Sequence, residues 1–66
     1  MAYRIKELRE AAGMTQTELS EKTGITRATI WKLETDDKAV TTTQTLVRIA
    51  NALDVSVADL FFDDGV

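Results

Sequence analysis

Apolar residues recur along the chain at helical spacing, in short segments separated by capping residues and glycines. Ile5 and Leu8 lie in the first segment, Ile30 and Leu33 in the third, and Leu46 begins a longer stripe in the fourth. Because side chains three or four positions apart share one face of a helix, each segment predicts an amphipathic helix. The expected helices span about residues 3–12, 15–24, 26–35 and 43–53, with a short fifth helix that begins at residue 56.

The residues that start and stop helices agree with this division. Thr15 and Glu18 form a capping box, and Ser56 and Asp59 form a similar pattern. Gly24 follows the second segment, where the left-handed backbone of a tight turn favours glycine. The β-branched run over residues 40–43 is interpreted as a loop and a cap. The sequence therefore predicts an all-α fold, a compact five-helix domain that occupies residues 1–66 as one unit.

The second and third segments are joined by the short turn Thr23-Gly24-Ile25. Two short helices connected by a three- or four-residue turn with glycine have the geometry of a helix-turn-helix. Ser20 is small where the helices approach closely, and Leu19, Ile25, Ile30 and Leu33 fill the space between them. We expect this motif over about residues 16–35. The alternative is an ordinary helical hairpin within a core.

The composition narrows the chemistry that the chain can perform. It has 66 residues, no cysteine and no histidine, which removes disulfides, thiolate metal sites and the usual general base. The pairs Asp36-Asp37 and Asp63-Asp64 are interpreted as solvated charges rather than as a catalytic acid and base. We therefore expect no enzyme, no metal site, no cofactor and no small-molecule ligand. The lack of a long apolar run or signal-peptide core predicts a cytoplasmic protein without membrane contact.

The net charge of −3 is unevenly distributed along the chain. Residues 1–35 carry six basic and five acidic side chains, whereas residues 36–66 carry two basic and six acidic ones. Screening at physiological salt acts over about 8 Å, so an acidic second half need not cancel a basic face elsewhere.

The stretch TQTELSEKTGITRATIWKLE over residues 15–34 resembles the helix-turn-helix of the Cro and lambda-type repressor family, also called the xenobiotic-response-element family. The flanking stretches LREAAGM and LVRIANALDVSVADLF are also similar, so nearly the whole chain is covered. The resemblance implies a sequence-specific regulator that binds double-stranded DNA, usually as a homodimer on a two-fold symmetric operator. We expect a small transcriptional repressor.

A helical wheel of the third segment turns Ala28 outward, flanked by Trp31 and Lys32, with Arg27 and Thr29 on its two edges. In a major groove Arg27 or Lys32 would donate to guanine, and Ala28 and the Thr29 methyl would meet thymine methyls. The alternative is an ordinary solvated helix face. The candidate DNA-binding residues are Gln16, Thr26, Arg27, Ala28, Thr29, Trp31, Lys32 and Lys38.

Two of these candidates come from the family resemblance. It implies that Gln16, at the start of the second helix, contacts the DNA backbone, where the helix N-terminus also suits an anion; the alternative is a solvent-facing glutamine. Lys38 is placed like phosphate-contacting family residues, although Asp36 and Asp37 lie beside it. Trp31 is left with two interpretations, a contact along a sugar-phosphate edge or a peripheral core residue folded over the loop or the first helix.

Arg9 and Glu34 each lie four residues after an inward isoleucine, at the edge of the core. The resemblance implies a salt bridge between them that ties the first helix to the third.

The fifth segment predicts both a core contribution and a dimer contact. Val57, Leu60 and Phe61 share one side of the wheel and would complete the core, whereas Phe62 points elsewhere. Phe62 with Val66 would therefore form a symmetric dimer interface; alternatively, Phe62 folds back near Val47. The apolar Leu60-Phe61-Phe62 run and the acidity of the chain motivate a second functional hypothesis, a protein-interaction module similar to an antitoxin partner.

Overall fold

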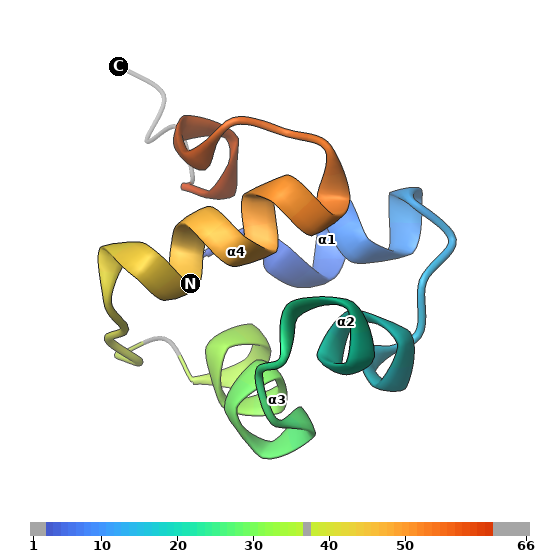
Figure 1. Cartoon of the computed structure of the whole chain (residues 1–66). Coiled ribbons are helices and arrows are strands. Elements are labelled where there is room, and N and C mark those ends of the chain that lie inside the picture. Colours follow the sequence, from blue (N-terminus) through green and yellow to red (C-terminus); the bar gives the residue numbers. More distant parts are fainter. Residues whose placement is uncertain (1–2, 37, 62–66) are drawn as a thin grey trace.

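The computed structural model describes residues 3–36 and 38–61 of the chain. Within them the backbone forms four α-helices and a short 3-10 helix, with no named strand (Figure 1). The elements are α1 (Ile5–Ala11), α2 (Gln16–Thr23), α3 (Arg27–Thr35), α4 (Thr43–Leu53) and η1 (Val57–Leu60). The predicted all-α fold is confirmed.

Threonine and serine side chains fix where these helices begin. The N–H of Glu18 donates to Thr15 Oγ1 (3.1 Å), and the N–H of Thr15 donates to Glu18 Oε1 (3.0 Å), which completes the predicted capping box of α2. Thr42 Oγ1 accepts from the N–H of Thr45 (3.2 Å) and caps α4 through this backbone bond, without a capping box. Because each cap satisfies an N–H that has no acceptor inside its helix, the helix boundaries follow from local side-chain chemistry.

The core receives one fully buried aliphatic side chain from every element. These side chains are Ile5 of α1, Leu19 of α2, Ile30 of α3, Ile49 of α4 and Leu60 of η1. Burial of such a side chain contributes about 1.5–3 kcal/mol of stability relative to exposure. Loss of any one element would therefore destabilise the fold. Figure 1 shows why they converge: α4 lies between η1 on one side and the α2–α3 pair on the other, and it also contacts α1.

The fifth predicted helix is a single 3-10 turn rather than an α-helix. The expected cap is present, because Ser56 and Asp59 exchange backbone and side-chain hydrogen bonds. The chain then turns into extended backbone at Phe61, which forms an antiparallel bridge with Tyr3. This pairing ends the helix and also explains why α1 begins after Tyr3 rather than at it.

The prediction that Phe61 fills the core is wrong. Leu60 is fully buried and Val57 packs partly against the core, but Phe61 is 45% exposed. Its ring lies beside that of Tyr3, with 5.6 Å between the centroids and 57° between the planes. The helical wheel failed here because the backbone at Phe61 is no longer helical.

Candidate nucleic-acid interface

The turn between α2 and α3 is held by two hydroxyl groups. Thr23 is buried, and its Oγ1 donates to the Leu19 carbonyl (2.7 Å) and accepts from the N–H of Ile25 (3.2 Å). Ser20 Oγ donates to the Ile25 carbonyl. Gly24 ends α2 with φ at +75°, a left-handed conformation that costs other residues strain. These contacts fix the direction in which the chain enters α3.

α3 turns one polar face to solvent and one apolar face to the core. Ile30 and Leu33 are buried, as the sequence stripe predicted. Neither Arg27 nor Lys32 has an ion pair with any residue that the structure describes. The one acidic residue of the helix, Glu34, is buried, so α3 itself contributes no carboxylate to the face that carries the two cations. The exposed residues of α3 are Arg27, Ala28, Thr29, Trp31, Lys32 and Thr35.

Thr26 caps the N-terminus of α3. Its Oγ1 accepts from the N–H of Thr29 (3.2 Å) and donates to Thr29 Oγ1 (2.9 Å). The Thr26 hydroxyl proton is thus already used, and a contact from that hydroxyl to a phosphate would have to replace this bond. The Thr29 methyl and hydroxyl remain on the exposed side of the helix.

Trp31 is 57% exposed and lies on the same face as the two cations of α3. In the free chain it is therefore not a peripheral core residue, which removes one of its two interpretations. Lys38 is exposed in the loop between α3 and α4, and its backbone N–H donates to Asp36 Oδ1 (2.9 Å). This bond shapes the loop through the backbone of Lys38 and does not involve its side chain.

Arg9 and Glu34 lie together between α1 and α3. Arg9 Nε donates to Glu34 Oε2 (2.8 Å) and Nη2 donates to Oε1 (3.2 Å), which forms a forked pair. Arg9 Nη1 also donates to the Met14 carbonyl just before α2 (2.7 Å). The hydrogen bond to the Glu34 carboxylate raises the pKa of the Arg9 guanidinium, against an opposing effect of burial.

Gln16 joins this pair, a contact that sequence reasoning missed. Its Nε2 donates to Glu34 Oε1 at 3.0 Å, and the residue is half-buried rather than solvent-facing. The two residues are 18 positions apart and on different helices. Helical spacing therefore gives no signal for the contact, which depends on how α2 and α3 are packed.

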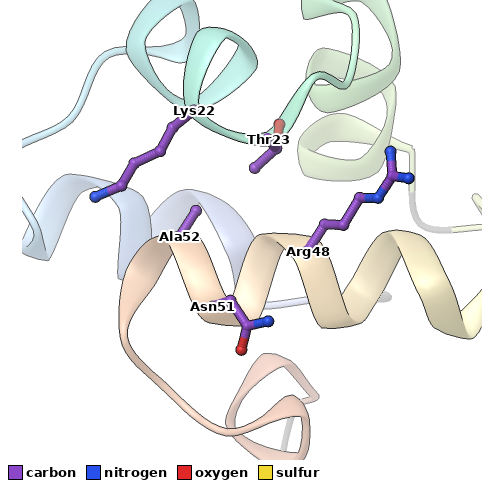
Figure 2. A pocket seen from close by; sticks show the side chains of 5 residues that line it. All are labelled: Lys22, Thr23, Arg48, Asn51 and Ala52. Carbon is purple, nitrogen blue, oxygen red and sulfur yellow. The ribbon is translucent and has the colours of Figure 1, made fainter.

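A shallow depression between α2 and α4 lies outside the predicted set of residues. It is lined by Lys22, Thr23, Arg48, Asn51 and Ala52. Figure 2 shows that the side chains of Lys22 and Arg48 extend away from each other, toward opposite ends of the depression. Their charges do not meet at one point, so we assign no ligand to it.

The proposed dimer residues Phe62 and Val66 lie outside the described residues. Across residues 3–36 and 38–61, no cluster of three acidic side chains could hold a metal ion. No helix in that part of the chain has the length and apolar character needed to cross a membrane.

The structure has the parts of a helix-turn-helix DNA-binding domain. These parts are a capped helix, a tight glycine turn and a second helix with an exposed polar face, and a small helical core supports them. The chain belongs to the Cro and lambda-repressor-type, or xenobiotic-response-element, helix-turn-helix family, because the family model described as helix-turn-helix matches residues 5–60.

Two similar proteins support this assignment. An uncharacterized HTH-type transcriptional regulator of Archaeoglobus fulgidus is 42% identical over 65 residues, which cover 97% of this chain and 91% of that protein. The solution structure of the N-terminal DNA-binding domain of the master biofilm-regulator SinR from Bacillus subtilis has a TM-score of 0.78 and 30% identity. That match covers 96% of this chain and 91% of the SinR domain. The fold is that of a DNA-binding transcription regulator.

Proposed function

We propose that this chain binds double-stranded DNA sequence-specifically and represses transcription as a homodimer on a palindromic operator. The observation that carries the proposal is the exposed face of α3, where Arg27 and Lys32 stand without an ion pair among the described residues. Repression requires only that a small domain occupies the operator. Because its proposed partner is DNA, we also propose that the protein acts in the cytoplasm.

The base-reading residues are proposed to lie on α3 in the major groove. Arg27 and Lys32 carry the donors that match guanine O6 and N7. Ala28 and the Thr29 methyl offer small apolar contacts for thymine methyl groups. All four residues are exposed, which satisfies the first requirement for contact with base edges.

The backbone-binding residues are proposed to lie beside that helix, with Trp31 on the helix itself. Lys38 presents its ammonium from the loop after α3, and Gln16 stands at the first position of α2. The exposed Trp31 would lie along a sugar-phosphate edge with its indole N–H toward a phosphate. Thr26 caps α3 and thereby holds the N-terminal end that enters the groove. Phosphate contacts of this kind set the orientation of the protein but carry no sequence information.

The homodimer is proposed on the sequence of the last residues. Phe62 and Val66 would form a self-complementary contact in a two-fold dimer. Such a dimer would separate two copies of α3 by about 34 Å, one turn of DNA, which matches a palindromic operator.

Selection of bound sequences from a random DNA pool tests the proposal most broadly. We expect one enriched palindrome, bound with an affinity that falls steeply as salt is added, because each cation that neutralises a phosphate contributes about −0.9 to the slope of log K against log salt. Lys38→Ala should reduce that slope by about 1 per protomer bound. Failure to enrich any sequence would contradict sequence-specific binding.

A protein-interaction module is the second candidate function, and the 45% exposure of Phe61 favours it. An apolar contact between proteins responds little to salt, whereas contact with several phosphates responds strongly. The salt dependence of binding therefore separates the two functions. A steep fall in affinity for the selected DNA supports the first, whereas binding that responds little to salt supports the second.

A further inference from the structure

One carboxylate serves two partners at the junction of three helices. Glu34 Oε1 accepts from Gln16 Nε2 (3.0 Å) and from Arg9 Nη2 (3.2 Å), while its Oε2 accepts from Arg9 Nε (2.8 Å). The Glu34 side chain is 1% exposed. Arg9 balances the buried charge, and Gln16 completes the set of donors.

This arrangement fixes the orientation of the Gln16 amide. A carboxylate is an acceptor only, so the amide must turn its nitrogen, not its oxygen, toward Glu34. The nitrogen carries two hydrogens. One is used on Glu34, and the second stays available at the first turn of α2.

The groups around the start of α2 determine how much this second N–H would contribute to binding an anion. The backbone N–H groups of the first helical residues have no acceptor inside the helix and attract negative charge. The Glu18 carboxylate, however, already occupies the N–H of Thr15 and places a like charge at the same helix end. The backbone alone is thus a weak site for a phosphate, and a fixed side-chain donor adds more here than at an uncapped helix.

We propose that Glu34 is a positioning residue for DNA binding: it holds the Gln16 amide with one N–H directed to a backbone phosphate. The inference rests on the proposed function, in which Gln16 contacts the DNA backbone. It assigns Glu34 a task beyond the salt bridge with Arg9. Because Gln16 is ordered before DNA arrives, binding loses less side-chain freedom than it would with a mobile glutamine.

A purely structural role for Glu34 predicts a different pattern of effects. If Glu34 only ties α1 to α3, its loss weakens every DNA contact alike, and the contribution of Gln16 is unchanged. If Glu34 positions Gln16, the contribution of Gln16 shrinks when Glu34 is absent. A double-mutant cycle on DNA affinity measures this difference directly.

The cycle uses a background in which the ion pair is replaced as a unit. Arg9→Met with Glu34→Met exchanges the buried pair for apolar side chains of similar length, a change that is often neutral for stability. Gln16→Ala is then made in the wild-type chain and in this background, and the four dissociation constants for the selected DNA are compared. Ile49→Val, a core change on α4, serves as a control for modest loss of stability.

We expect Gln16→Ala to weaken DNA binding about tenfold in the wild-type chain and less than about twofold in the background that lacks Glu34. Ile49→Val should leave the tenfold effect unchanged. Equal losses in both backgrounds, or no loss in either, would overturn the role of Glu34 while leaving DNA binding by α3 intact. If the wild-type chain binds no DNA sequence, the proposed function itself fails.

A measurement on the unmodified chain keeps the inference testable even where the replaced pair does not fold. Gln44 is a matched control, since it is an exposed glutamine near the start of α4. In the free protein, NMR of the side-chain amides should show slower hydrogen exchange and higher order for Gln16 than for Gln44. A Gln16 amide as mobile as that of Gln44 would overturn the proposal.

Discussion

Arg9 Nε lies 2.8 Å from Glu34 Oε2, which joins α1 to α3 across 25 positions of the chain. Through Met14 the same guanidinium also holds the loop that leads into α2. The exposed fractions of the two side chains are 10% and 1%, so solvent can replace little of what either partner provides. This buried ion pair therefore helps to fix the position of α3 relative to α1.

Breaking this pair from one side should destabilise the domain strongly. We expect Arg9→Ala and Glu34→Ala each to lower the free energy of unfolding by about 3 kcal/mol, because each leaves a buried charge uncompensated. The double variant should lose clearly less than the sum of the two. Denaturant unfolding of the four proteins measures the coupling.

The control for that measurement is the other ion pair among the described residues, Arg4 with Glu7. Arg4 Nη2 lies 2.9 Å from Glu7 Oε1, and both side chains are much more accessible to solvent than those of the buried pair, with exposed fractions of 33% and 59%. Alanine substitutions there should change stability little, because exposed pairs are screened by solvent. Additive effects at Arg9 and Glu34 would show that the two side chains do not stabilise each other.

The capping box of α2 predicts an acid-sensitive contribution to stability. The backbone N–H of Thr15, more than its side chain, lowers the pKa of the Glu18 carboxyl below its usual range. The stabilisation by Glu18 is therefore complete above its unfolded pKa of about 4.3 and is lost as the pH falls through the lower folded value. Melting temperatures of the wild type and Glu18→Gln between acid and neutral pH should converge in acid. A gap that stays constant would contradict this contribution.

Two residues with left-handed backbone should respond to substitution in opposite directions. Asp54 ends α4 with φ at 58°, which is strained for a residue with a side chain, whereas Gly24 has φ at +75°. We expect Asp54→Gly to raise stability by about 0.5 kcal/mol and Gly24→Ala to lower it by about 1 kcal/mol. A Cβ at Gly24 would meet no atom within 4 Å, so its cost is backbone strain alone. Thermal unfolding tests both, and a neutral Gly24→Ala would show that the turn tolerates a side chain.

The sequence was most informative where structure depends on near neighbours. α4 spans the predicted residues 43–53, because its cap at Thr42 and its apolar stripe are both local signals. The helix-turn-helix was predicted for the same reason, from the cap at Thr15 and the glycine at position 24.

Contacts between distant residues were missed. The Tyr3–Phe61 bridge shortens the last helix to one 3-10 turn, and nothing near Phe61 in the sequence indicates it. The Gln16–Glu34 bond arises from the packing of two helices and was likewise not predicted. Both involve polar or backbone groups, whose partners hydrophobic periodicity does not identify.

Homodimer formation is tested at Phe62. We expect Phe62→Asp to shift the protein toward monomer, because the substitution places a charge in the proposed apolar contact. Binding to a palindromic site should weaken more than binding to a half-site. Sedimentation of both proteins at matched concentration measures the change. An unchanged dimer, or a monomeric wild type, would remove Phe62 from the interface.

The exposed face of α3 is proposed to read DNA sequence. The binding of α3 variants to the selected operator tests this role most directly. Arg27→Ala and Lys32→Ala should each cost about 1–3 kcal/mol of binding free energy and relax the preference at one base pair, with helical content unchanged. Lys22→Ala is the matched control, since it removes the same charge from a side chain on α2 that lines the depression between α2 and α4 (Figure 2). Wild-type affinity and base preference in both α3 variants would contradict the claim.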